Sequence, residues 1–192
     1  LFVFGTHPHW RMPLSEDLNI FKSNLAEITH PQIYEEDSQF ETNIAEVLER
    51  IPKRMDQQDN FFKKNATLLG ASWFKNNRIM FLFSDGDDTE GVDFGRSIME
   101  LNKRNIKIYS VGVGAKEGKT ITIEGYDPND PNKTIKTTIK TGLKMQRLNE
   151  IASKTNGETY IIDSAVSVSG AQSFLKNAVN SNRTLTPRLV AS

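Results

Sequence analysis

The chain has 192 residues, with 24 Lys or Arg and 24 Asp or Glu, so its formal net charge is zero. This balance excludes the strong basic field that attracts nucleic acid or an anionic membrane surface, and we expect no nucleic-acid partner. The absence of cysteine excludes disulfides, thiolate catalysis and Cys-ligated zinc. The length suits one α/β domain, and no apolar run approaches the ~20 residues that span a bilayer.

The N-terminal part of the chain predicts one strand followed by a helix. Leu1 to Gly5 is an apolar run typical of a buried strand. The chain thus opens inside a strand pattern without an initiator methionine, and we expect it to be a piece of a longer protein. The helix begins at Ser15 to Asp17, which are suitable capping residues. Its apolar residues recur at helical spacing: Leu18, Phe21, Leu25 and Ile28.

Two further helices are predicted before the next strand. Ser38 and Glu41 match a capping box and open the second helix. Pro52 breaks or kinks this helix, because proline lacks the N–H that the helix needs. A third helix is predicted over 56–75. Its large aromatic residues are expected in the core, with a partner-facing patch as the alternative: Phe61, Phe62, Trp73 and Phe74.

The second half of the chain alternates strands and helices. The continuous apolar strand 78–84 is expected to have helices on both faces. The later strands are predicted at 106–113 and 159–163, and the later helices at 92–104, 144–155 and 172–182. Residues 119–140 differ, because two β-rich runs flank the turn-rich YDPNDPN and predict an inserted hairpin. Its lysines are expected to be solvated: Lys133, Lys136 and Lys140.

This order of elements predicts the fold class. Alternating strands and helices indicate an α/β fold that is doubly wound, with a mostly parallel central sheet and helices on both faces. The predicted architecture is therefore Rossmann-like, with the β-hairpin added to it.

One acidic loop follows the strand 78–84 directly. It carries Asp85, Asp87, Asp88 and Glu90 within six residues. Ligands of open parallel sheets bind at the carboxyl ends of the strands, and oxygen-rich clusters suit Mg²⁺ or Ca²⁺. The alternative is a polar turn whose acidic residues stabilise the start of the next helix. The loop alone leaves both interpretations open.

The segment FLFSDGDDTEG resembles the third metal-site segment of von Willebrand factor A (vWA) domains, especially of bacterial Bat-type (aerotolerance operon) membrane proteins. Four other stretches resemble family segments in the family's order: LFVFGTHPHWRMPLSED, FETNIAEVL, IKIYSVGVGAKEG and LNEIASKTNGETYII. The resemblance covers nearly the whole chain. It implies a vWA-like domain over 1–183, N-terminally incomplete, with a linker or tail at 184–192.

The resemblance also implies a metal site. The family builds its metal-ion-dependent adhesion site from a D-x-S-x-S loop, a threonine and an aspartate, which match Thr42 and Asp85 here, although Glu41 replaces a usual glycine. Asp87, Asp88 and Glu90 are then the ligand-binding rim. Mg²⁺ (or Ca²⁺ or Mn²⁺) held in this way takes an acidic side chain of a protein partner. No D-x-S-x-S occurs in these 192 residues, so we expect the complete site only in the intact parent protein.

The function implied by the resemblance is that of a protein-binding module, and not of an enzyme. The parent protein is expected to be anchored in a bacterial inner membrane, with this domain outside the bilayer and the periplasmic side as its candidate location. A metal-independent interaction or scaffold domain is one alternative. The other is a magnesium-dependent phosphatase of the haloacid-dehalogenase type, since Asp85 and Asp87 fit its nucleophile and general acid. That enzyme also needs a later acidic pair, which the sequence lacks.

Two weaker patterns complete the candidates. His7 and His9 are able to share one face of an extended segment and chelate a metal with a nearby carboxylate, but such a pair is more typical of a surface turn. Gly112, Gly114 and Gly118 follow a strand and fit no phosphate-binding loop. We interpret these glycines as tight-turn residues.

Overall fold

The structure, a computed structural model, describes residues 1–13, 17–28, 42–69, 78–88, 93–127 and 130–182. The predicted capping box at Ser38 and Glu41, the residues Trp73, Phe74 and Glu90, and the predicted tail lie outside the described residues. The chain forms two compact units. The first comprises Leu1–Arg78, Asp88–Lys107 and Asn182–Ser192, and the second comprises Ile79–Asp87 and Ile108–Ser181. Each unit is described by itself.

The first unit opens with a small hairpin. Strand β1 (Phe2–Phe4) confirms the predicted first strand, and it pairs antiparallel with β2 (Pro8–Trp10). The rings of Phe2 and Trp10 meet edge to face, with 4.4 Å between their centroids. The guanidinium of Arg54 lies 5.9 Å from the centroid of the Trp10 ring, a cation–π arrangement that ties the hairpin to the helix carrying Arg54.

That helix, α2 (Ile44–Leu69), is continuous where the sequence predicted two helices. Asn43 caps its first turn, since the Asn43 side-chain oxygen accepts the N–H of Glu46 at 2.8 Å. Pro52 lies inside the helix and is fully buried. A proline in a helix interior costs about 3 kcal/mol. Pro52 is buried together with apolar side chains of the preceding turns, and this burial offsets the cost: Ile44, Val47, Leu48 and Ile51.

Helix α1 (Leu18–Ala26) confirms the predicted helix. Asp17 caps it as expected, since its carboxylate accepts the N–H groups of Asn19 and Ile20. Its apolar side chains are exposed among the described residues, at 67% for Leu18 and 49% for Leu25. Helical spacing shows only that apolar side chains share a face, and not that another element covers that face.

Phe61 on α2 is likewise 64% exposed, so its predicted core position is wrong. The side chain of Phe62 lies outside the described part of the chain. Helix α3 (Gly95–Lys103) packs against α2 in the first unit and follows the buried side chain of Phe94. It confirms the predicted helix at 92–104 within a few residues.

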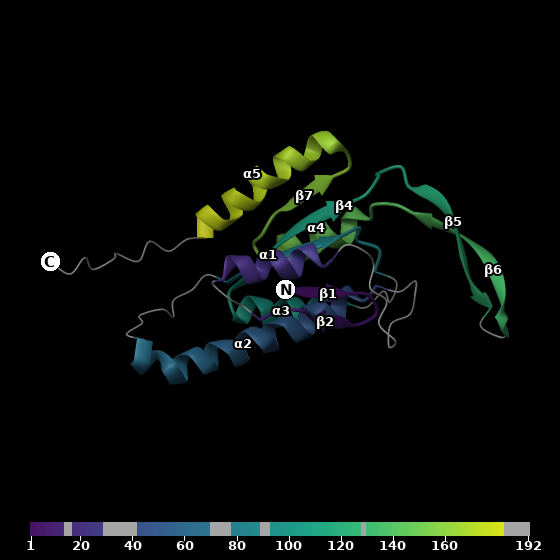
Figure 1. Ribbon diagram of the computed structural model, residues 1–192. Helices are drawn as coiled ribbons and strands as arrows, with labels where there is room; N and C mark the ends of the chain where they lie inside the picture. Colours follow the sequence, from purple (N-terminus) through teal and green to yellow (C-terminus); the bar gives the residue numbers. More distant parts are fainter. Residues whose placement is uncertain (14–16, 29–41, 70–77, 89–92, 128–129, 183–192) are drawn as a thin grey trace. The chain divides into compact units, whose positions relative to one another are not determined.

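The second unit contains a three-stranded parallel sheet in the order β3 (Arg78–Ser84), β4 (Ile106–Val113) and β7 (Thr159–Ile162). The first residues of β3 and β4 belong to the first unit. Helices α4 (Met145–Lys154) and α5 (Ala165–Asn182) lie on opposite sides of the sheet (Figure 1). This arrangement confirms the predicted α/β class.

Successive residues of β4 contact α4 and α5 alternately. On one face, Thr155 at the end of α4 accepts the N–H of Ile108 at 3.1 Å through its buried hydroxyl. On the other face, the ring of Tyr109 packs against Phe174 of α5, with 5.9 Å between centroids. The core of the second unit therefore lies on both faces of β4, as expected for a central parallel strand.

Helix α5 begins seven residues before its predicted start. Ser164 and Ser167 cap it reciprocally, because the Ser167 hydroxyl accepts the N–H of Ser164 at 3.0 Å and the Ser164 hydroxyl faces the N–H of Ser167 at 3.4 Å. Glu or Gln is usual at the later position of a capping box, so the sequence signal was missed. The absence of a side chain at Gly170 lets the Tyr160 hydroxyl approach this helix closely. A Cβ at position 170 would lie 2.0 Å from that hydroxyl.

The inserted hairpin is confirmed. It consists of β5 (Lys119–Asp127) and β6 (Asp130–Thr141), which pair antiparallel with a register shift at Tyr126 and Asp127. Lys133 and Lys136 are exposed as predicted, and the side chain of Lys140 is outside the described ones.

A network of ion pairs joins three elements of the first unit. Asp56 on α2 accepts hydrogen bonds from Arg78 at 2.9 Å and from Arg104, just after α3, at 2.7 Å. Arg78 also binds Asp59, and Arg104 binds Glu100 at 2.6 Å. The network holds α2, the start of β3 and the end of α3 together.

Acid is expected to weaken this network. Hydrogen bonds from Lys103 and Arg104 lower the pKa of Glu100 from 4.5 to about 2. Burial tends to raise the pKa of Asp56, but hydrogen bonds from Arg104 and Arg78 outweigh it, and the pKa is lowered. Because both folded-state pKa values are lower than the unfolded ones, the stabilisation is complete above pH 4.5 and is lost as the pH falls toward about 2.

We predict that the urea midpoint of unfolding falls over this pH range and that Arg104→Gln flattens the fall. Lys22→Gln, on the exposed surface of α1, serves as the control and should keep the wild-type slope. An Arg104→Gln slope equal to that of the wild type would contradict the role given to the network.

Candidate functional site

The acidic loop begins where β3 ends, and Asp85 is its exposed first residue. The carbonyl oxygen of Asp85 accepts the N–H of Lys144 at 2.8 Å, which fixes the backbone against the start of α4. Its carboxylate Oδ1 accepts the N–H of Asp87 at 3.0 Å. Ser84 supports the turn, since its hydroxyl accepts the N–H of Gly86 at 3.0 Å. The Asp85 carboxylate is therefore held by its own loop and presented to solvent.

Gly86 makes this geometry possible. Its φ of +76° lies in the left-handed region, which side chains other than glycine rarely adopt. A Cβ at this position would lie 2.3 Å from the carbonyl oxygen of Lys144. The loop therefore reaches the start of α4 only because residue 86 has no side chain.

Asp87 has an ion-pair partner from outside the loop. The ammonium of Lys144 forms an ion pair with its carboxylate. No local sequence pattern predicts this pair, because 57 residues separate its members. Asp87 and Lys144 together present both signs of charge beside Asp85.

Thr42 and Asp88 belong to the first unit. The carboxylate of Asp88 accepts the N–H of Ile44, the first residue of α2, at 3.3 Å. Asn43 in turn donates its N–H to the carbonyl oxygen of Gly5 at 2.9 Å. Asp88 thus stabilises the start of α2, where a negative charge is favourable, and holds the backbone two residues beyond Thr42. Asp85 and Asp87 belong to the second unit.

A second ion pair lies at the carboxyl ends of β4 and β7. The Lys116 ammonium and the Asp163 carboxylate are 3.4 Å apart. The hydrogen bond from Lys116 lowers the pKa of Asp163. Sequence reasoning did not select either residue. Three loops of the second unit therefore bring charged side chains to the same edge of the sheet: those that carry Asp85, Lys116 and Asp163.

The chemistry of Asp85 fits one oxygen ligand of a hard cation. Oδ1 of Asp85 accepts the N–H of Asp87 within the loop, and no described residue donates a hydrogen bond to Oδ2 of Asp85. An exposed, monodentate carboxylate oxygen suits Mg²⁺, which keeps several other ligands. Within the described ranges, no three His, Asp or Glu side chains gather into a metal-binding group. Asp85 thus supplies a single carboxylate.

The two histidines considered from the sequence have different surroundings. His7 Nδ1 lies 2.7 Å from the Glu46 carboxylate, and Glu46 also binds Arg50. His9 lies on β2 and pairs with Val3 across the hairpin. The Glu46 carboxylate is thus close to His7, but the second partner of Glu46 is the guanidinium of Arg50.

Two of the three glycines follow β4 and have the positive φ values expected of turn residues, whereas Gly112 lies within β4. Gly114 and Gly118 have φ values of +144° and +62°. Gly112 has another role, because a Cβ there would lie 2.8 Å from the sulfur of Met145. It lets α4 approach the sheet.

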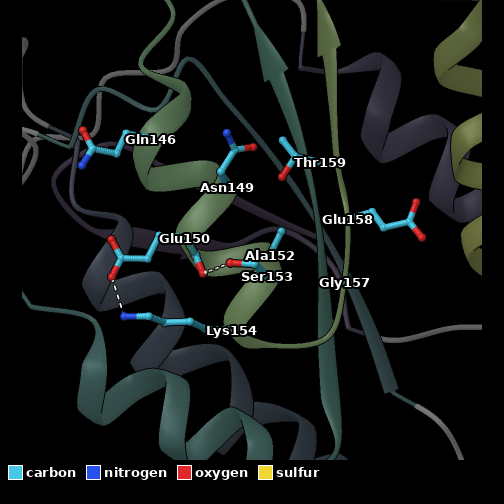
Figure 2. A pocket seen from close by; sticks show the side chains of 9 residues that line it. All are labelled: Gln146, Asn149, Glu150, Ala152, Ser153, Lys154, Gly157, Glu158 and Thr159. Carbon is cyan, nitrogen blue, oxygen red and sulfur yellow. Dashed lines mark hydrogen bonds and ion pairs between the residues drawn. The ribbon is translucent and has the colours of Figure 1, made fainter.

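A separate depression lies at the opposite end of β7, where the strand begins (Figure 2). It has a volume of about 620 Å³ and is lined by polar residues from α4 and the start of β7. Glu150 and Lys154 form an ion pair at 2.7 Å on its helical side (Figure 2). The sequence did not indicate this site, because Gln146, Asn149, Glu150 and Ser153 follow the spacing of an ordinary solvated helix face.

Two solved structures share the fold of this chain. The conserved hypothetical protein BatB from Bacteroides thetaiotaomicron has a TM-score of 0.64 at 19% identity, and the match covers 93% of this chain and 78% of BatB. An aerotolerance-related membrane protein from Bacteroides fragilis also has a TM-score of 0.64 at 19% identity, with coverage of 94% and 77%. The fold predicted from the Bat-type resemblance is therefore confirmed.

No protein-family model matches the chain, and no curated protein matches it in sequence. No helix in the described part of the chain is both long and apolar enough to cross a membrane.

We predict that Gly86→Ala destabilises the protein by about 2–4 kcal/mol, the sum of a strained left-handed residue and an overpacked contact. Gly95→Ala is the control, because a Cβ there meets only the flexible Asp93 carboxylate at 3.3 Å, and φ is not positive. Urea unfolding of both variants measures the difference. Equal stability of the two variants would show that the close approach at Gly86 is not a constraint.

Proposed function

We propose that this chain is a vWA-type protein-binding module of a bacterial, membrane-associated Bat-type protein, and that it is not an enzyme. The fold shared with BatB and with the aerotolerance-related membrane protein over more than nine-tenths of the chain supports this proposal. The ordered family-like segments of the sequence support it independently. In the parent protein we place the module outside the bilayer, on the periplasmic side of the inner membrane.

The observation that carries the proposal is the presentation of Asp85. Its carboxylate stands at the carboxyl end of a parallel strand, exposed, with its backbone fixed by Lys144 and one oxygen not bound by the described residues. This is the place where open α/β sheets bind ligands.

The proposed metal is Mg²⁺, with Ca²⁺ or Mn²⁺ as substitutes. Asp85 and Thr42 are two of its protein ligands. A D-x-S-x-S loop outside these 192 residues supplies the remaining protein ligands. Asp88 supports Thr42 through its hydrogen bond to Ile44. With few carboxylates the ion keeps excess positive charge, so it binds an acidic side chain of a protein partner.

Asp87 and Lys144 have a different proposed role from the metal ligands. Their ion pair is partly exposed, so salt screens it and its members are able to exchange partners. An incoming acidic group competes with Asp87 for the Lys144 ammonium. We propose that the pair and Glu90 form the rim that orients the partner.

The alternative of a metal-independent interaction module keeps the same partner surface and needs no third ligand loop. The Asp87–Lys144 pair favours it, because a bound cation close to Asp85 would be repelled by the ammonium. Metal titration distinguishes the two proposals.

We predict that Mg²⁺ binds the natural protein that contains these residues together with their neighbouring segments, and that Asp85→Ala weakens binding by on the order of 100-fold or more. Loss of a metal ligand should lower the metal affinity at least as much as loss of a contact that supports a ligand. Loss of such a supporting contact lowers the affinity about 10- to 100-fold. Glu158→Ala removes the same charge at the opposite end of the sheet and should leave binding unchanged. Calorimetric titration measures all three proteins, and equal binding by wild type and Asp85→Ala would exclude the assigned ligand.

We predict no magnesium-dependent hydrolysis of p-nitrophenyl phosphate above the rate in buffer. The reason is that a phosphatase of the alternative type needs a later acidic pair to hold its metal, and the chain offers only Asp163 at that strand end, bound to Lys116. Turnover that Asp87→Ala abolishes would instead favour the phosphatase.

A further inference from the structure

The β5–β6 hairpin is a long ribbon that pairs only with itself. Figure 1 shows it extending away from the ends of β4 and β7 in the second unit. No other described helix or strand packs extensively against it. Two-stranded hairpins are marginally stable in water, and sheets of three or more strands are needed for independent stability. Each strand of this hairpin has one edge without a paired strand among the described residues.

The register divides the hairpin into two faces. Residues that are directly opposite in an antiparallel pair lie on the same face. Ile121 pairs with Ile139 on one face, which Ile135 shares, while Thr122 pairs with Thr138 on the other. Thr122, Lys136 and Thr138 are exposed on the second face, and Lys133 is exposed near the end of the first face. The hairpin therefore gathers its isoleucines on one face, while threonine and charged residues dominate the other face.

The sequence of β6 is complementary to itself when read in the opposite direction. Residues 133–141 are KTIKTTIKT. In an antiparallel pair centred on Thr137, Ile135 lies opposite Ile139 of the second strand, and each lysine lies opposite a threonine. No lysine faces a lysine, and the isoleucines of both strands remain on one face. Like charges directly opposite each other destabilise a pair, and this arrangement avoids them.

We infer that β6 is a dimerisation strand, which pairs antiparallel with β6 of a second copy of this chain about a two-fold axis at Thr137. The product is a four-stranded sheet in the order β5, β6, β6 and β5, with the isoleucines of both hairpins on one face. Strand β5 is less suitable, because Gly125 interrupts it.

Single cysteines test the register of this dimer without background, because the chain has no cysteine. In Thr137→Cys the two sulfurs lie across the axis, at a backbone spacing of about 4.5–5.5 Å that a disulfide is able to bridge. Mild oxidation should give a species of twice the chain mass that reductant reverses. In Thr134→Cys the two positions are six residues apart along the ladder, about 20 Å, and should not cross-link.

Equal cross-linking at 134 and 137 would indicate random collision and overturn the inference. So would preferential cross-linking of Thr122→Cys, which would place the contact on β5. The absence of cross-linking at all three positions has the same consequence.

Sedimentation equilibrium of the unmodified chain supplies a measurement that needs no cysteine. Thr138→Lys places a lysine opposite Lys136 of the second copy, twice by symmetry, and should shift the dimer to monomer. Thr122→Lys adds the same charge at the position paired with Thr138 inside one hairpin, so it should leave the dimer unchanged. Both sites are exposed, which favours folding of both variants. A monomeric wild type, or an equal effect of the two variants, would overturn the inference.

Discussion

The close approach of α4 to β3 and β4 is the constraint on which the arrangement of the second unit depends. Two glycines permit it, since a Cβ at Gly86 would meet the Lys144 carbonyl oxygen at 2.3 Å and one at Gly112 would meet the Met145 sulfur at 2.8 Å. Because the helix starts so close to the loop, the Lys144 N–H binds the Asp85 carbonyl. The same approach brings the Lys144 ammonium to Asp87. Backbone packing thus decides which carboxylate is exposed and which is paired.

The acidic loop is divided by its contacts. Asp85 is exposed, Asp87 is bound to Lys144, and Asp88 stabilises the first turn of α2. Four carboxylates within six residues would repel one another if all faced the same point, so such a loop is stable only when its charges have separate partners. This division favours a site with one direct carboxylate over a cluster of several. A cation held in that way keeps charge for an acidic group of a partner, which is the basis of the proposed function.

Sequence reasoning was accurate where a local signal was strong. The strand 78–84, the inserted hairpin and the Asp17 cap each depend on apolar continuity, turn residues or a side chain near its own helix. It was wrong where packing opposed a local preference. Pro52 remains inside α2, where it is buried together with apolar side chains of the preceding turns, and α5 starts at an unusual Ser–Ser capping box. For α1 the apolar pattern was recognised correctly, but periodicity contains no information about what covers the face.

The sequence by itself determined the α/β class, the order of its elements, the hairpin and the choice of Asp85 as the leading residue of the acidic loop. Those features follow from local periodicity, turn chemistry and the rule that ligands bind at strand ends. Only the tertiary structure decided that Lys144 binds Asp87, that Lys116 binds Asp163 and that Asp88 belongs to the start of α2. The physical reason is distance along the chain. Partners separated by more than 40 residues meet only because strands and helices pack, and no local pattern specifies such a meeting.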